Sequence, residues 1–184
     1  MQNIAVYAGS FDPFTNGHLS IVKSASDLFD HVYVVIAQNA NKHRNIDAQK
    51  MCEAMKEVFG NKGFLNCTVL LLPNILVADY CKELDAKYLV RGLRNTSDYM
   101  YEENIAKINW EINPELKTIY FRADNEVISS SMVRELLSYG KNIDRYIPTE
   151  ILKLLKSGTS WFSCRYPFAQ KIDINASNLY VEII

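Results

Sequence analysis

The sequence lacks an excess of charge of either sign. Lys and Arg total 20 and Asp and Glu total 21, which gives a formal net charge of −1. A chain with this balance has no general attraction for nucleic acid or for an anionic membrane surface, so neither is expected as a partner. A local basic pocket is still compatible with the balance, and its candidate residues are Lys42, Arg91, Arg94 and Arg134.

Cysteine is scarce and is not spaced for metal binding. The cysteines at positions 52, 67, 81 and 164 form no CxxC pair, and no histidine stands near enough to complete a zinc module. We therefore expect reduced, mostly buried thiols. No apolar run approaches the length needed to span a membrane, and the N-terminus has no charged region followed by an apolar stretch. We expect no signal peptide and a cytoplasmic protein.

Internal repeats and low-complexity segments are also absent, and 184 residues with 48% hydrophobic content suffice for one domain with a proper core. Strand-like and helix-like segments alternate along the chain. Strands are expected over 4–7, 32–36, 67–72, 88–90 and 118–121, with the fourth ending at Arg91. Helices are expected from 19 onward and over 47–58, 75–84, 97–110, 129–139 and 148–156. This alternation predicts an α/β fold, a Rossmann-like parallel sheet of about five strands with helices on both faces.

The most informative stretch is GSFDPFTNGH, residues 9–18, which follows the first expected strand and leads into a helix. Such a turn can hold a phosphate, because N–H groups point outward at the start of a helix and the helix dipole favours negative charge. Gly17 has no side chain to keep a ligand away from the backbone. His18 adds a donor whose charge can change near neutral pH. Asp12 and Pro13 are typical of a turn rather than of catalysis.

Other polar segments follow the later strands. Lys42 comes after the second strand, Arg91 to Arg94 after the fourth, and Ser129 to Ser131 after the fifth. The carboxyl ends of parallel strands share one edge of the sheet, so we expect these segments to converge on a cleft near a topological switch point. The serines are first of all N-caps, and a capped helix start with spare N–H groups also binds phosphate oxygens. Arg134, one turn later, could reach the same anion.

Taken together, these motifs resemble the phosphopantetheine adenylyltransferase family. This family belongs to the nucleotidyltransferases that share a Rossmann-like core with class I aminoacyl-tRNA synthetases. The resemblance rests on residues 9–18, on Lys42, on the RGLR segment at 91–94 with Asp98, Tyr99, Tyr101 and Glu102 behind it, and on residues 128–134. It implies a nucleotidyltransferase domain over residues 1–157. Residues 158–184 form a C-terminal extension outside the resemblance, rich enough in apolar residues that we expect it to pack on the domain or on a neighbouring subunit.

The resemblance implies a reaction and its components. AMP is transferred from ATP to 4′-phosphopantetheine, giving dephospho-coenzyme A and pyrophosphate, by in-line displacement with no covalent intermediate. Mg²⁺ is held mainly by phosphates and water rather than by protein ligands. The resemblance also implies a homohexamer.

It implies roles for individual residues as well. His18 stabilises the transition state by donating to the α-phosphate of ATP, with Lys42 as the second catalytic residue and a mobile phosphate clamp. The residues implied in binding phosphopantetheine are Ser10, Lys42, Val77 and Arg91. The residues implied in binding ATP are Ser10, Phe11, His18, Gly92, Leu93, Arg94, Glu102, Asn125, Glu126, Val127, Ile128, Ser129, Ser130 and Ser131.

The sequence departs from the family pattern in two places. His43 and Arg44 follow Lys42 where the family has lysine-proline, and residues 122–127 are about two residues shorter than usual and lack an aromatic. One rival interpretation is another nucleotidyltransferase of this superfamily, acting on nicotinamide mononucleotide or making a CDP-alcohol; the RGLR segment argues against it. A second rival is a non-catalytic nucleotide-binding module, against which the intact His18 and Lys42 argue.

Overall fold

The computed structural model describes residues 2–37, 44–72, 75–122 and 128–157. Within them lies a five-stranded sheet in which every pair of neighbouring strands is parallel and the strand order is β3-β2-β1-β4-β5. The strands are β1 (Ile4–Gly9), β2 (His31–Ile36), β3 (Cys67–Leu71), β4 (Tyr88–Leu93) and β5 (Lys117–Arg122). The sequence predictions for Lys42, for Asn125 to Val127 and for the extension over 158–184 concern residues outside the described ranges.

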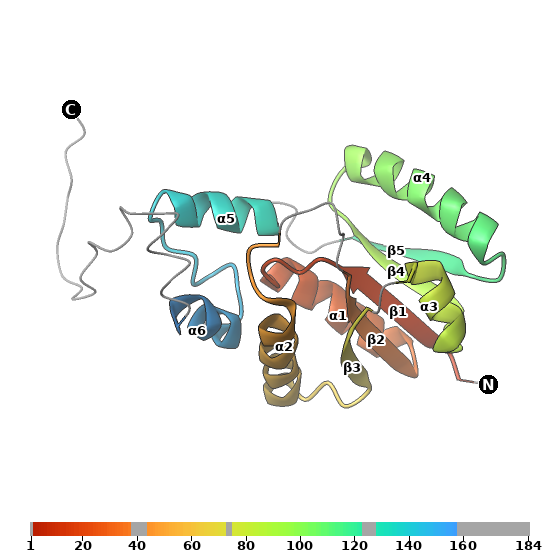
Figure 1. Ribbon diagram of the computed structural model, residues 1–184, viewed down its shortest axis with the longest axis horizontal. Helices are drawn as coiled ribbons and strands as arrows, with labels where there is room; N and C mark the ends of the chain where they lie inside the picture. Colours follow the sequence, from red (N-terminus) through yellow and green to blue (C-terminus); the bar gives the residue numbers. More distant parts are fainter. Residues whose placement is uncertain (1, 38–43, 73–74, 123–127, 158–184) are drawn as a thin grey trace.

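Helices cover both faces of the sheet (Figure 1). One face packs against α1 (Asn16–Leu28) and α2 (Ala48–Lys62), and α5 (Ser130–Ser138) and α6 (Thr149–Ser157) extend the same apolar core. The other face packs against α3 (Val77–Glu83) and α4 (Thr96–Ile112). The prediction of a Rossmann-like α/β fold with helices on both faces is therefore confirmed. No helix in the described part of the chain is long and apolar enough to cross a membrane.

Two predicted helix starts are built on side-chain caps. Asp47 accepts a hydrogen bond from the Lys50 amide at 2.9 Å at the start of α2. Ser129 accepts one from the Met132 amide at 3.1 Å at the start of α5. Such caps satisfy backbone donors that a helix start otherwise leaves unpaired, and each contributes about 1 kcal/mol.

The predicted end of the fourth strand is wrong. β4 does not stop at Arg91 but continues to Leu93, because residues 91–93 pair in register with residues 120–122 of β5. Arg91 and Gly92 are therefore strand residues, and their side-chain directions point to opposite faces of the sheet. This places Arg91 on the α4 side and Gly92 on the α1 side.

The cysteines fit the expectation of buried thiols in the described part of the chain. Cys52 and Cys81 are buried, Cys67 is half-buried, and all three are free. Burial raises the thiol pKa of Cys67 to about 11 and that of Cys81 to about 12, so these groups stay protonated at neutral pH. Cys164 lies outside the described residues.

Candidate active site

A cavity of about 810 Å³ opens at the carboxyl ends of β1 and β4, a size typical of small-molecule sites. These are the strands where the order of the sheet reverses, which is where open α/β sheets bind ligands. The predicted site residues that line the cavity are Ser10, Phe11, His18, Val77, Arg91, Gly92, Arg94, Ile128, Ser129, Ser130 and Ser131. Leu93 and Glu102 are not among the lining residues.

The turn after β1 is anchored by an aromatic cluster. Phe11 is buried, although its φ of 45° lies in the left-handed region that side chains rarely adopt. Its ring packs edge-on against Tyr7 at 5.3 Å and against His18 at 5.1 Å between centroids. Apolar burial of the ring offsets the backbone strain, which is on the order of 1–3 kcal/mol for such a residue. The same packing half-buries the His18 ring, which also lines the cavity.

Thr15 and His18 cap the start of α1 reciprocally. The Thr15 hydroxyl accepts from the His18 amide at 3.3 Å, and the Thr15 amide donates to Nδ1 of His18 at 3.0 Å. A nitrogen that accepts from an amide carries no proton, so the neutral imidazole holds its proton on Nε2. The capping therefore fixes both the orientation of the ring and its tautomer, and leaves Nε2–H as the donor.

The expectation that His18 changes charge near neutral pH is corrected by its surroundings. Burial and, secondarily, the positive charge of Arg94 lower the pKa of His18 from 6.5 to about 4. A proton on Nδ1 would also displace the hydrogen bond from the Thr15 amide. His18 is therefore a neutral hydrogen-bond donor at pH 7 and not a group that titrates there.

The start of α5 is fastened to the same turn. Ser130 Oγ donates to the Pro13 carbonyl at 2.8 Å, and Arg134 donates to the Asp12 carbonyl and to Ser131 Oγ. Arg134 thus lies at the cavity, and part of its guanidinium holds the turn. Its contact with an anion stays a prediction. The contacts bring the first and last motifs of the sequence together.

Gly17 has a packing role beside the one predicted for it. A Cβ added to Gly17 would lie 3.1 Å from the Ile128 carbonyl oxygen and 3.5 Å from the Ile128 Cβ. The missing side chain therefore lets the chain segment before α5 approach the start of α1. This close approach brings Ile128 and Gly17 to the wall of one cavity.

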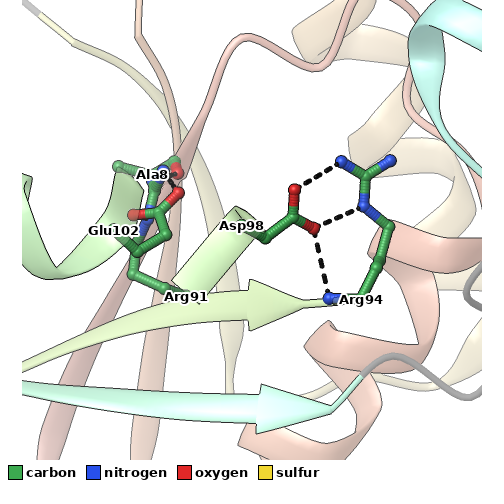
Figure 2. Close-up of polar contacts among 5 residues, drawn as sticks. All are labelled: Ala8, Arg91, Arg94, Asp98 and Glu102. Atoms are coloured by element: carbon green, nitrogen blue, oxygen red, sulfur yellow. Dashed lines mark hydrogen bonds and ion pairs between the residues drawn. The ribbon is translucent and has the colours of Figure 1, made fainter. Parts of the chain in front are cut away.

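Arg91 and Glu102 form a largely buried, two-pronged ion pair (Figure 2). Nε and Nη2 of Arg91 donate to the two carboxylate oxygens at 2.6 and 2.5 Å, and Nη1 donates to the Ala8 carbonyl at 2.6 Å. Burial alone lowers the pKa of Arg91, but the hydrogen bonds and charge of Glu102 raise it above its usual value. Arg91 lines the cavity, whereas Glu102 contacts Arg91 and does not line the cavity. The contact of Glu102 with the ribose or adenine, which the family resemblance implies, stays a prediction.

Arg94 is held by the helix that follows it. Its Nε and Nη2 donate to the Asp98 carboxylate at 2.8 and 3.1 Å, and its backbone amide donates to the same group at 3.2 Å (Figure 2). Nearby, a Cβ on Gly92 would lie 3.1 Å from Cγ1 of Ile21, so the glycine makes room for α1. A paired arginine keeps a defined position, which suits it to contact an anion at the cavity.

Sequence reasoning missed part of the cavity wall. Arg44 and Asp12 line it, although the sequence indicated only a basic loop residue and a turn residue. Tyr101 lines it from α4, and the missed apolar side is formed by Leu72, Ile75 and Leu76. One signal in the sequence could have indicated Arg44 as a cavity residue. It lies two positions after Lys42, where the sequence departs from the family pattern.

The fold and the family match define the chain as a nucleotidyltransferase, since its sequence matches the cytidylyltransferase-like family over residues 6–136. Closer relatives narrow the class. The chain is 38% identical over 158 residues to the phosphopantetheine adenylyltransferase of Streptococcus uberis, with 85% of this chain and 94% of the relative covered. It is 40% identical over 158 residues to that of Streptococcus pneumoniae, covering 85% and 96%. The chain therefore belongs to the phosphopantetheine adenylyltransferase family.

Solved structures support the same fold. A putative nicotinate-nucleotide adenylyltransferase from Vibrio parahaemolyticus superposes with a TM-score of 0.68 at 20% identity, covering 90% of this chain and 98% of its own. The nicotinic acid mononucleotide adenylyltransferase of Plasmodium falciparum superposes with a TM-score of 0.65 at 18% identity, covering 88% and 98%. At these identities the likeness speaks for the fold alone.

Proposed function

We propose that this protein transfers AMP from ATP to 4′-phosphopantetheine, giving dephospho-coenzyme A and pyrophosphate. The proposal depends on one observation: His18, whose tautomer is fixed by its hydrogen bond from the Thr15 amide, lines the same cavity as three arginines, Arg91, Arg94 and Arg134. This constellation suits a reaction between two anionic phosphates, and relatives with 34–40% identity bear the name of that activity.

The chemistry needs no proton transfer from the nucleophile. An oxygen of the phosphopantetheine phosphate attacks the α-phosphorus of ATP, and the bond from that phosphorus to the β-phosphate bridging oxygen breaks, so that pyrophosphate leaves. Negative charge builds on the oxygens of the α-phosphate. Nε2–H of a neutral His18 can donate to one of them, and a donor that is already oriented costs no reorganisation during the reaction.

Magnesium would serve as an electrostatic partner of the nucleotide. Both carboxylate oxygens of Asp12, at the cavity wall, already accept hydrogen bonds from residues 45 and 46. In the described ranges, no group of three or more His, Cys, Asp or Glu side chains is placed to hold a metal ion. The surroundings therefore fit an ion whose ligands come mainly from phosphates and water. When bound, the ion would neutralise phosphate charge.

Assembly and location are further parts of the proposal. The family resemblance is the reason to propose a homohexamer, and sedimentation of the purified protein tests it. The same resemblance is the reason to propose a cytoplasmic location.

Product identification tests the proposed reaction. Purified protein is mixed with ATP, Mg²⁺ and either phosphopantetheine or nicotinamide mononucleotide, and the products are separated by mass. We expect dephospho-coenzyme A and pyrophosphate from the first mixture, and a His18→Ala control should be slower by about 10²–10³-fold. Robust turnover of nicotinamide mononucleotide instead would overturn the assignment.

A further inference from the structure

The segment Arg44 to Ile46 is interlocked with the turn after β1. Nη1 of Arg44 donates to the Ser10 carbonyl at 2.6 Å, and Nη2 donates to the Phe11 carbonyl at 3.3 Å. Nε of the same guanidinium donates to the Ile46 carbonyl at 2.5 Å. One planar group thus bridges two chain segments that lie more than thirty residues apart.

Asp12 completes the interlock from the other side. Its Oδ2 accepts from the Asn45 amide at 3.0 Å and from the Asn45 side chain at 2.7 Å, and its Oδ1 accepts from the Ile46 amide at 2.9 Å. Asp12 is 6% exposed. A carboxylate from the turn therefore holds the segment, while a guanidinium from the segment holds the turn.

The cost of burying Arg44 is offset by these contacts. Burial lowers the pKa of the guanidinium, and the nearby carboxylates of Asp12 and Asp47 act in the opposite direction. Hydrogen bonds that involve an ionised donor are about twice as strong as neutral ones. The three carbonyl contacts use the fixed fork of donors that arginine has and lysine lacks.

This arrangement has a consequence for the reaction. The turn that Arg44 holds also contains Ser10 and Phe11 of the cavity wall, and the Phe11 ring packs against His18 at 5.1 Å. A shift of the turn would therefore move both the phosphate-binding backbone and the donor imidazole. Misplacement of reacting groups by about 1 Å can cost on the order of 10²-fold in rate.

We propose that Arg44 is a positioning residue for nucleotidyl transfer, which aligns the turn at Ser10 and Phe11 with His18 through its three carbonyl contacts. This inference rests on the proposed function, and the family motif does not supply it, because the family has proline at this place. Arg44 acts through the turn rather than on the reacting atoms. Asp12 is its structural counterpart.

The test compares Arg44→Lys and Arg44→Gln with the wild-type full chain. We expect kcat for pyrophosphate release to fall about 10–100-fold in both variants, because a misaligned turn misplaces the groups that meet the α-phosphate. We expect the KM for ATP to change less than about fivefold, since the contacts align the turn rather than bind nucleotide directly. The matched control is Lys23→Gln on the exposed side of α1, which should keep the wild-type kcat.

Three outcomes would overturn the proposal. The first is a lower unfolding midpoint with an unchanged kcat per folded site, which would mean a purely structural role. The second is full recovery of kcat by Arg44→Lys, which would mean that charge suffices and the fork is irrelevant. The third is full additivity of Asp12→Asn and Arg44→Lys in kcat, since two halves of one interlock should be strongly non-additive.

Failure of the proposed function would look different. If the wild type uses nicotinamide mononucleotide instead of phosphopantetheine, the same kcat comparison is made with that acceptor, because the inference concerns alignment at the α-phosphate. A wild type that turns over no acceptor would overturn both proposals. A fully active wild type with unaffected Arg44 variants would overturn the inference alone.

Discussion

His18 should make the stability of this protein depend on pH in one direction. Its pKa is about 4 in the folded chain, through burial and the charge of Arg94, against 6.5 for a free imidazole. Between these values the unfolded chain binds a proton that the folded chain does not. The free energy of unfolding therefore falls as pH drops from about 6.5 to about 4, and the contribution of His18 is fully present above that window.

The size of the effect follows from the shift. A difference of 6.5 minus about 4 corresponds to at most about 3.5 kcal/mol, because one pKa unit equals about 1.4 kcal/mol. Urea unfolding of the wild type and of His18→Gln is measured across that pH range. The comparison isolates the contribution of His18 to the pH dependence of stability, because the two proteins share all other titrating groups. As the pH falls through this range, the free energy of unfolding of the wild type should decrease relative to that of His18→Gln by up to that amount.

A direct titration makes the prediction sharper. NMR signals of the His18 ring should show a midpoint near pH 4 and, above it, an unprotonated Nδ1 with the proton on Nε2. The kcat of the enzyme should then show no dependence on His18 ionisation between about pH 5.5 and 8. A midpoint near 6.5, or parallel stability curves for the two proteins, would refute the reasoning.

Three further predictions concern packing and charge. Gly17→Ala should lower the free energy of unfolding in urea by about 1–2 kcal/mol, because its Cβ would crowd a backbone oxygen at 3.1 Å. The control Gly60→Ala, in open space on α2, should raise it by about 1 kcal/mol, and a change in the same direction for both variants would contradict this reasoning. Glu102→Gln should lower the free energy of unfolding by about 3 kcal/mol, because it breaks the largely buried ion pair with Arg91. The control Asp27→Asn, in an exposed pair, should lower it by less than about 0.5 kcal/mol, and similar losses in the two variants would contradict a stabilising Arg91–Glu102 pair. Arg91→Lys should raise the KM for phosphopantetheine in steady-state assays, because lysine has no planar fork, and an unchanged KM would remove Arg91 from the substrate site.

Much of the architecture could be predicted from local signals. The helix caps at Asp47 and Ser129 were predicted from residue type and position, because capping is a contact within one turn of chain. The alternation of strands and helices predicted the parallel sheet, since buried strands and amphipathic helices have different periods. The end of β4 was missed because Arg91 looks like a polar stop, while its pairing with β5 extends the strand.

The site shows a similar division. The amino-acid sequence alone was enough to locate the glycine-containing turn after β1 and to indicate the family, because each is recognised from residues that lie close together in the chain. Three features became visible only in the packed structure: His18 is neutral, Glu102 pairs with Arg91, and Arg44 holds the turn. Protonation and pairing depend on which groups meet across the fold and on how much water they lose. Those quantities arise only when segments far apart in the sequence are packed together.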